Sequence, residues 1–316
     1  MSDELPGALE RVLAPAQRSG QLRLREALAP HTQFGVGGPA RWYWEPAQPE
    51  LVPEALRACR ELGLPWLVLG AGSNCLVADD GFPGLVLKFP QVRARHLGDG
   101  LVELPAGAML PRAAFDTAYL GLVDLAFGVG IPGTAGAAAA GNAGAFGGEL
   151  GSVLSSLEAV LPWGETERLP SARLQPAYRH TTLQDPPLAG AVVTRVWVQL
   201  RPGDPTQARR EVRRVMTERK ASQPSGVRSL GSTFKNPPQQ TAGRLIEACG
   251  LKGFQVGQAQ VSPIHANFIV NLGGARAADV LALTDAIRQR VRQRFGVQLE
   301  LEIIPVGGPD PHPRSS

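Results

Sequence analysis

The order of apolar and polar positions predicts a β-α-β unit in the first third of the chain. The run ARWYWEP (residues 40–46) predicts a strand, and the stretch at residues 49–63 predicts a helix. The apolar run WLVLG (residues 66–70) predicts a buried strand. We expect a further amphipathic helix before this unit, near the N-terminus.

A second group of elements follows a polar linker at residues 90–100. The pattern predicts a helix near residues 110–120 and strands at residues 156–162 and 190–200. The segment RPGDPTQ (residues 201–207) is rich in turn-forming residues, so it predicts the clearest domain boundary in the chain.

Two further helices and a terminal strand are predicted beyond that boundary. The helices span residues 208–220 and 277–294, and the strand spans residues 298–306. The apolar stripe of the first helix consists of Ala208, Val212, Val215 and Met216. That of the second helix consists of Val280, Leu283, Ile287 and Val291. Arginines fill the other face of the first helix, which is typical of a solvent-exposed surface.

The elements are segregated and do not alternate regularly, which favours an α+β fold over a doubly wound α/β sheet. We divide the chain into two α/β subdomains, residues 1–89 and 90–201, and a C-terminal α+β domain, residues 202–307. The tail at residues 308–316 (GPDPHPRSS) is expected to be disordered.

The amino-acid composition indicates the cellular compartment in which the protein works. The chain has 316 residues, 43% of them apolar, which is enough for several hydrophobic cores. Cys59, Cys75 and Cys249 are an odd number without a C-x-x-C pair, which indicates a reducing compartment. We find neither a signal peptide nor a run approaching 18 uncharged apolar residues, so we expect a cytoplasmic protein with no membrane association.

The charge pattern excludes further classes of function. The formal net charge of +4 is modest, and the basic helix has no interleaved aromatic residues, so we expect no nucleic-acid binding. At most this helix helps to attract an anionic ligand. The histidines show no metal-ligand spacing, so no metal centre is predicted.

The glycine run GVGIPGTAGAAAAGNAGAFGGE (residues 128–149) contains the pattern G-x-G-x-x-G at Gly128, Gly130 and Gly133. A dinucleotide-binding fingerprint should be followed, about 20 residues on, by an acidic residue at the end of a second strand. The run instead predicts a small-residue helix or tight coil with no strand before Glu149. The Rossmann interpretation is therefore disfavoured.

A second glycine-rich loop, LGAGSN (residues 69–74), directly follows the predicted strand WLVLG. Small residues there let backbone N–H groups approach a phosphate closely, while Ser73 and Asn74 offer side-chain hydrogen bonds. Two such loops, both expected at strand ends, suit a diphosphate held from two sides. Two structural turns without a ligand remain the alternative.

Together with further motifs, these loops resemble the MurB family, the UDP-N-acetylenolpyruvoylglucosamine reductases. The other motifs are HTQFGVGGPA (residues 31–40), AYRHTTL (177–183), GSTFKNP (231–237), SPIHANFIVN (262–271) and GVQLELEIIPVG (296–307). The departures are His31 for the usual Asn, Ala137 for a common Gly and Thr181 for a Ser. No room remains after Leu183 for the extra tyrosine-bearing loop of some members, so the chain resembles the shorter, second type.

The resemblance implies a PCMH-type FAD-binding fold, in which residues 1–89 and 90–201 hold FAD without a covalent bond and residues 202–307 bind substrate. NADPH would be the co-substrate, and UDP-N-acetylglucosamine enolpyruvate would be reduced to UDP-N-acetylmuramate for peptidoglycan synthesis. The expected FAD-binding residues are Gly70, Ala71, Gly72, Ser73, Asn74, Gly133, Thr134, Gly136, Asn142 and Gly144.

The resemblance also assigns three catalytic residues. Arg179 would hold the substrate carboxylate and its developing enolate, Ser232 would protonate C2, and Glu302 would act close to the enolate. Alternation alone places Glu300 and Glu302 on one face, so only the motif selects Glu302, and we expect burial to raise its pKa. A surface-turn arginine and a turn-capping serine are the structural alternatives.

Substrate contacts are implied for Tyr178, Lys220, Asn236 and His265. His265 could equally be a histidine of the core. Two rival functions stay open: another PCMH-type flavoprotein, such as an oxidase, and a non-catalytic nucleotide-sugar binding module. An oxidase with covalently bound flavin usually uses His or Cys in its FAD loops, and Cys75 is the only thiol beside either loop.

Overall fold

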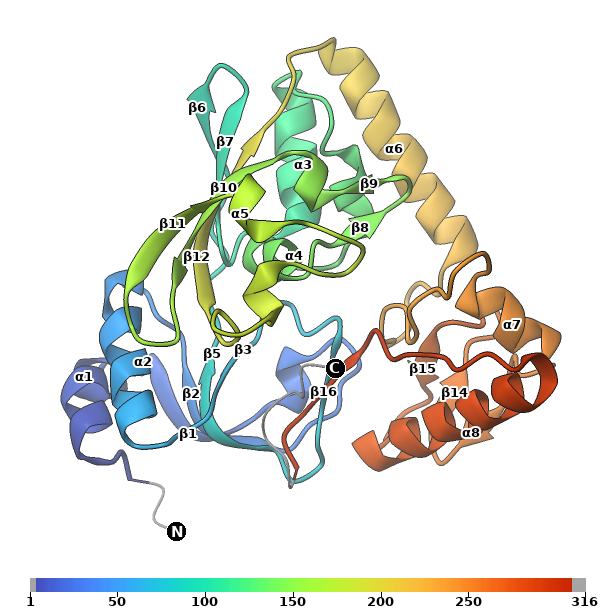
Figure 1. Ribbon diagram of the computed structural model, residues 1–316, viewed down its shortest axis with the longest axis horizontal. Helices are drawn as coiled ribbons and strands as arrows, with labels where there is room; N and C mark the ends of the chain where they lie inside the picture. Colours follow the sequence, from blue (N-terminus) through green and yellow to red (C-terminus); the bar gives the residue numbers. More distant parts are fainter. Residues whose placement is uncertain (1–3, 309–316) are drawn as a thin grey trace.

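The computed structural model describes residues 4–308, so residues 309–316 of the expected tail lie outside the described residues. Three lobes are visible in Figure 1: a first lobe with α1 and α2, a second lobe with α3 to α6, and a C-terminal lobe with α7 and α8. The predicted combination of α and β elements is confirmed.

A four-stranded sheet forms the centre of the first lobe. Its strands, in spatial order, are β1 (Leu22–Ala27), β2 (Pro39–Trp44), β5 (Phe82–Leu87) and β3 (Trp66–Val68). The helices of this lobe are α1 (Gly7–Arg18) and α2 (Val52–Glu61). Both β2 and β3 run parallel to β5, which lies between them, so the predicted β-α-β unit is confirmed. Because β3 is an edge strand, its residues are half-buried, so the expectation of a buried strand at residues 66–70 holds only for Leu69, which follows β3.

The second lobe contains a five-stranded antiparallel sheet. Its strands, in spatial order, are β11 (Thr166–Pro170), β10 (Leu154–Val160), β12 (Val192–Gln199), β7 (Leu101–Pro105) and β6 (Arg95–Gly98). Its shorter elements are α3 (Leu110–Tyr119), α4 (Ala135–Ala140), α5 (Ser171–Leu174), β8 (Gly144–Ala145) and β9 (Gly148–Glu149). The segment predicted as a polar linker thus contains β6, whose residues are exposed because it is an edge strand paired only with β7.

The long basic helix α6 (Pro205–Ser222) packs on the second lobe. Its predicted apolar stripe is confirmed: Ala208, Val212 and Val215 are buried in the same core as β12 and α3, and Met216 packs against that core. In Figure 1 this helix runs from the second lobe down to the C-terminal lobe. We therefore propose that the boundary lies after Ser222 and not at residue 201; the domain limits remain predictions.

The C-terminal lobe is built on a three-stranded antiparallel sheet and two helices. Its elements are α7 (Ala242–Ala248), β13 (Gln255–Val256), β14 (Ala259–Val261), β15 (Ile269–Asn271) and α8 (Ala277–Phe295). All four aliphatic residues predicted on one face of α8 are buried. The chain then returns to the first lobe, where β16 (Ile304–Val306) pairs in parallel with β4 (Cys75–Val77).

The predicted terminal strand at residues 298–306 is only partly correct. Regular pairing begins at Ile304, whereas the preceding residues make only the isolated bridge between Leu301 and Phe234. These residues cross from one lobe to another, so no single neighbouring strand accompanies them. Residues 4–308 also contain five short 3-10 helices: Ala29–His31, Pro49–Leu51, Ala126–Gly130, Leu150–Ser152 and Thr182–Gln184.

Candidate active site

The two glycine-rich loops approach each other at the junction of the first and second lobes. A Cβ atom added to Gly70 would lie 2.7 Å from Oγ1 of Thr134, which belongs to the other loop. A Cβ atom added to Gly72, whose φ is +63°, would lie 2.5 Å from the carbonyl oxygen of His31. Only glycine allows this approach of backbone to backbone. The loops are therefore packed together as the diphosphate interpretation requires.

A cavity of about 270 Å³ opens beside these loops. Its walls come from both lobes and include His31, Gly70, Ala71, Lys88, Met109 and Thr134. A cavity lined by Gly70, Ala71 and one ammonium group, that of Lys88, suits the phosphates of a dinucleotide cofactor. Three of the predicted cofactor residues, Gly70, Ala71 and Thr134, line this cavity directly.

The glycine-rich loop at residues 128–149 was expected to follow a strand, and in the structure it does not. The chain enters it through the 3-10 helix Ala126–Gly130 and not through a strand, so only the first loop lies at a strand end. Beyond the turn at Gly133, α4 starts after its N-cap, Thr134. Gly136 packs on Ala106, where a Cβ atom would lie 2.9 Å from the alanine Cβ, and Gly144 lies in β8. This geometry excludes a strand-turn-helix Rossmann motif.

The side-chain nitrogen and oxygen of Asn142 are both hydrogen-bonded within the protein, and its contact with FAD stays a prediction. Asn142 is buried, its amide nitrogen donates to the carbonyl oxygen of Ala177 at 2.8 Å, and its side-chain oxygen accepts from the backbone N–H of Gly151 at 2.7 Å. Thr181 donates to the carbonyl oxygen of Ala140, at the end of α4. The side chain of Asn142 therefore holds the turn that carries Arg179.

The first glycine-rich loop is bonded to the segments that carry two of the predicted catalytic residues. The carbonyl oxygen of Ser73 accepts from the N–H of Gly231 at 3.1 Å. The side-chain amide of Asn74 donates to the carbonyl oxygen of Glu302 at 2.8 Å, and its backbone oxygen accepts from Ile304. Ser73 and Asn74 thus fix the substrate-side segments against the cofactor loop.

Arg179 and Glu302 meet although 123 positions separate them in sequence. The Nε of Arg179 donates to Oε1 of Glu302 at 2.5 Å, and their side chains are 24% and 13% exposed. Burial raises the pKa of Glu302, while Arg179 and then Lys235 act in the opposite direction. The predicted direction of this shift is confirmed, and its physical cause is desolvation.

Ser232 lies between two anchored neighbours. Gly231 is bonded to the first glycine-rich loop, and the carbonyl oxygen of Thr233 accepts from the N–H of Glu302 at 2.9 Å. Within residues 4–308 the Ser232 hydroxyl has no hydrogen-bond partner, and the residue is half-buried. The serine is therefore held beside the Arg179–Glu302 pair with its hydroxyl free to contact a ligand.

Two of the predicted substrate residues adjoin this pair. Tyr178 is 51% exposed, its ring centroid lies 5.3 Å from the guanidinium carbon of Arg179, and its hydroxyl accepts from the N–H of Asn236 at 3.4 Å. The side-chain oxygen of Asn236 accepts from the N–H of Ala242 at the start of α7. Both residues are exposed, so both are accessible to a ligand.

The structure gives His265 and Lys220 less support. Nδ1 of His265 accepts from the N–H of Asn267, its ring packs edge-to-face on Phe268, and burial lowers its pKa. These contacts favour a structural histidine. Lys220 is exposed at the end of α6 and forms no hydrogen bond or ion pair with the residues described.

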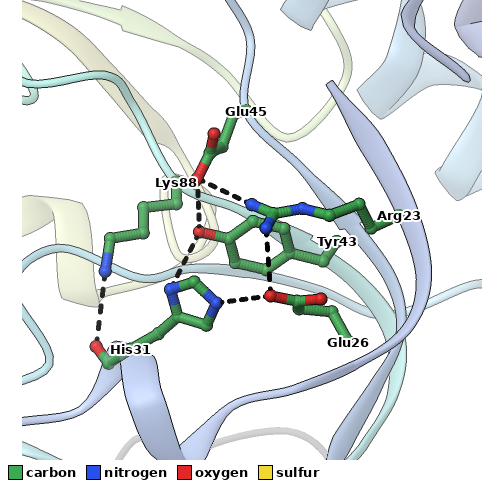
Figure 2. Close-up of polar contacts among 6 residues, drawn as sticks. All are labelled: Arg23, Glu26, His31, Tyr43, Glu45 and Lys88. Atoms are coloured by element: carbon green, nitrogen blue, oxygen red, sulfur yellow. Dashed lines mark hydrogen bonds and ion pairs between the residues drawn. The ribbon is translucent and has the colours of Figure 1, made fainter. Parts of the chain in front are cut away.

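Two features of the site were not foreseen. Lys235, inside GSTFKNP, lies 3.6 Å from Glu300 and lowers the pKa of Glu302. A polar cluster consists of Arg23, Glu26, His31, Tyr43, Glu45 and Lys88 (Figure 2), of which His31 and Lys88 line the cavity. For Lys235 the motif itself was the available signal. The cluster has none, because its members are scattered over β1, a 3-10 helix, β2 and the residues that follow β2 and β5.

No metal-binding group of three or more His, Cys, Asp or Glu side chains occurs in the part of the chain that the structure describes. Within the same residues, no helix combines the length and the apolar character that crossing a bilayer requires.

The fold and the cavity define a flavoprotein with two cofactor-binding lobes and a substrate lobe. The FAD binding domain family matches residues 40–170, which extend across both walls of the cavity. The C-terminal domain family of UDP-N-acetylenolpyruvoylglucosamine reductase matches residues 223–306. FAD is therefore the cofactor, as predicted.

Similar proteins place the whole chain in one family. The UDP-N-acetylenolpyruvoylglucosamine reductase of Anaeromyxobacter dehalogenans strain 2CP-1 is 48% identical over 91% of this chain and 87% of its own length. Reductase 2 of Symbiobacterium thermophilum is 44% identical, covering 93% and 95%. The crystal structure of the reductase (MurB) from Thermus caldophilus superposes with a TM-score of 0.75 at 38% identity, covering 90% and 97%. The chain belongs to the UDP-N-acetylenolpyruvoylglucosamine reductase family.

Proposed function

We propose that this chain reduces UDP-N-acetylglucosamine enolpyruvate to UDP-N-acetylmuramate, a precursor of peptidoglycan, and consumes NADPH. The observation that carries the proposal is the half-buried Arg179–Glu302 pair, held beside Ser232 where segments of all three lobes meet. Bound FAD supplies the hydride transfer from NADPH to C3 of the enolpyruvyl group. The chain itself must bind the carboxylate, stabilise the enolate and protonate C2.

Arg179 binds and orients the substrate carboxylate. Its guanidinium remains charged at neutral pH and can donate two parallel hydrogen bonds to a carboxylate. Because its Nε is already bonded to Glu302, its terminal nitrogens are left for the substrate. Partial burial of the guanidinium strengthens its interaction with the negative charge that develops on the enolate.

Glu302 fixes the guanidinium and would repel the enolate if it stayed charged and unpaired. Burial raises its pKa, which favours the protonated form, and Arg179 offsets this by stabilising the ionised form. Ser232 supplies the proton to C2 from its free hydroxyl. A serine is a weak acid, so the reaction requires that the carbanion form close to it in a site with little water.

The chemistry of the thiols supports a free flavin and a reducing location. Burial raises the pKa of the Cys75 thiol to about 11, so the thiolate needed to attach a flavin is scarce at neutral pH. This disfavours a covalent oxidase. Cys59, Cys75 and Cys249 are all unpaired, which supports the cytoplasm as the site of the reaction.

An anaerobic two-step absorbance experiment tests the function. Addition of NADPH to the purified protein should bleach the flavin band, and addition of UDP-N-acetylglucosamine enolpyruvate should restore it. Bleaching without recovery would reject the substrate but keep the flavoprotein. Denaturation should release free FAD into the supernatant, and flavin retained in the precipitate would favour a covalent oxidase. The absence of a flavin band would favour a nucleotide-binding module.

A further inference from the structure

Lys88 is the one cationic residue among the residues that line the cavity. It directly follows β5, at the start of the crossover to the second lobe, and it is half-buried. Its Nζ donates to the carbonyl oxygen of His31 at 3.3 Å. Within the described residues it forms no ion pair, unlike Lys235 and Lys252, which lie 3.6 and 2.7 Å from carboxylate oxygens.

An ammonium group in this position lacks the solvation that a surface lysine has. Burial lowers the pKa of Lys88, and Glu45 only partly opposes this. The group has three N–H donors, of which the His31 carbonyl takes one. Burial of the ammonium group without an ion-pair partner costs free energy. An anion bound in the cavity would offset this cost, because it would pair with the charge and accept hydrogen bonds from the remaining N–H groups.

The carbonyl that holds Lys88 is itself fixed by the polar cluster (Figure 2). The ring of His31 lies between Glu26, whose Oε1 is 2.8 Å from Nε2, and Tyr43, whose hydroxyl is 3.2 Å from Nδ1. The same ring stacks on Tyr43 with a centroid separation of 4.5 Å. Oε1 of Glu45 accepts from the Tyr43 hydroxyl at 2.9 Å.

Arg23 closes this cluster. It donates to Glu26 at 3.1 Å and to Glu45 at 2.9 Å, and its guanidinium carbon lies 4.6 Å from the Tyr43 ring centroid. Burial and Glu45 raise the pKa of the Tyr43 phenol, so the phenol stays protonated as a donor. The imidazole of His31 therefore has contacts on both nitrogens and on one face, which fixes the direction of its backbone carbonyl.

We propose that Lys88 is a cofactor-contacting residue that donates hydrogen bonds to the diphosphate of FAD, and that Tyr43 is a positioning residue that acts through His31. The proposal rests on the proposed function in one respect, since it takes FAD as the ligand. The diphosphate is the anionic part of FAD, and the glycine loops beside Lys88 supply backbone and small side chains but no cationic group. A lysine ammonium is a compact charge suited to phosphate oxygens.

The decisive experiment measures ligand binding by the full-length protein after FAD has been removed. FAD, ADP and adenosine serve as probes, the last of which lacks the phosphates. Lys88→Met should raise the Kd for FAD and for ADP by about 10- to 100-fold, as expected for loss of a charge-assisted hydrogen bond, and should leave adenosine unchanged. The salt dependence of ADP binding should also become weaker in this variant.

Lys252→Met is the matched control, because that lysine is ion-paired to Glu247 in the C-terminal lobe. It should bind all three probes like the wild type. Unchanged FAD and ADP binding by Lys88→Met would overturn the proposal, and so would an equal loss for adenosine, which would indicate a damaged cavity wall. A wild-type protein that binds no FAD would refute the proposed function instead.

A double-mutant cycle tests the positioning role. Tyr43→Phe removes only the hydroxyl that contacts His31 and Glu45, and it should weaken ADP binding about 3- to 10-fold in the wild-type background. In the Lys88→Met background the same change should have no further effect. Equal weakening in both backgrounds would show that Tyr43 supports the wall without acting through Lys88. Lys88→Arg, which keeps the charge, should retain part of the salt-dependent binding if the charge is what matters.

Discussion

At the scale of single residues, Glu300 and Glu302 show how environment separates two identical side chains. Glu300 is 74% exposed and lies 3.6 Å from Lys235, whereas Glu302 is 13% exposed and bonded to Arg179. Alternation alone placed both on one face. That argument assumed a continuous strand, but the chain is irregular here, so the two side chains meet different lobes.

The two glutamates should therefore respond differently to the same substitution. Glu302→Gln replaces the carboxylate that pairs with Arg179 by a neutral amide, and we expect a loss of about 10²- to 10⁴-fold in the rate of flavin reoxidation by the enolpyruvyl substrate. Glu300→Gln should cost less than about 2-fold, because a surface ion pair contributes little. Stopped-flow absorbance measures both, and the reverse ranking would place the catalytic carboxylate at residue 300.

The same burial predicts a pH effect on stability. Because the pKa of Glu302 is raised in the folded state, the native protein binds this proton more tightly than the unfolded chain does. The stability contributed by this residue is thus fully present below the ordinary pKa of glutamate and is lost as pH rises through the raised value.

The stability of the wild type relative to Glu302→Gln should therefore decline as pH increases through that window. Urea unfolding of both proteins at several pH values measures the difference in the free energy of unfolding. Glu300→Gln, at the exposed position, is the control. A difference that stays constant or grows with pH would contradict a raised pKa.

Ser232 can be tested by separating the two half-reactions. Ser232→Ala removes a hydroxyl that has no partner within residues 4–308, so folding and flavin reduction by NADPH should remain close to wild type. Flavin reoxidation should slow by about 10²-fold or more, since C2 lacks its proton donor. If both half-reactions slow to the same extent, the serine has a structural role.

At the scale of elements, hydrophobic periodicity correctly predicted the helices that pack one continuous face against a core. The four aliphatic positions of α8 and the stripe of α6 were foreseen because each helix buries one face. Sequence motifs likewise located Arg179 and Glu302, which local pattern could not bring together. The hydrophobic pattern did not predict β6 or the polar cluster around Tyr43, because both depend on contacts between separate segments. β6 forms by pairing with β7, and the cluster forms where β1 pairs with β2.

The placement of α6 in the second lobe leads to a prediction about stability. Val212 is buried in the core shared with β12, so Val212→Ala should lower the free energy of unfolding by about 2 kcal/mol. Hydrogen exchange should accelerate in peptides from β12 and α3 and stay unchanged in α8. Arg213→Ala, on the exposed face of α6, is the control. Faster exchange confined to α7 and α8 would assign the helix to the C-terminal lobe, as the boundary at residue 201 assumed.

At the scale of the whole molecule, the C-terminal lobe is attached to the first lobe at several points. β16 pairs with β4, the side-chain amide of Asn271 donates to the carbonyl oxygen of Phe34 at 2.9 Å, and Asp79 accepts from the first backbone N–H groups of α8. The Arg179–Glu302 pair connects the second lobe to the segment that returns from the C-terminal lobe. The substrate lobe is thus held in place through the first lobe, and catalytic geometry depends on that attachment.

Asp79 offers a way to loosen one attachment without touching the cavity. Its carboxylate oxygens lie 2.8 and 3.2 Å from the N–H groups of Ala277 and Ala278, so it acts as a helix cap supplied by another lobe. Asp79→Ala should lower the free energy of unfolding by about 1 kcal/mol and accelerate hydrogen exchange at the start of α8.

Because Asp79 does not line the cavity, the same substitution should leave the Kd for FAD unchanged while it raises KM for the enolpyruvyl substrate. Asp80→Ala is the matched control, since the neighbouring aspartate is exposed and its side chain forms no hydrogen bond or ion pair within residues 4–308. Steady-state kinetics and flavin fluorescence measure the two quantities separately. Weaker FAD binding with an unaltered KM would mean that the attachment supports the cofactor lobes and not the position of the substrate lobe.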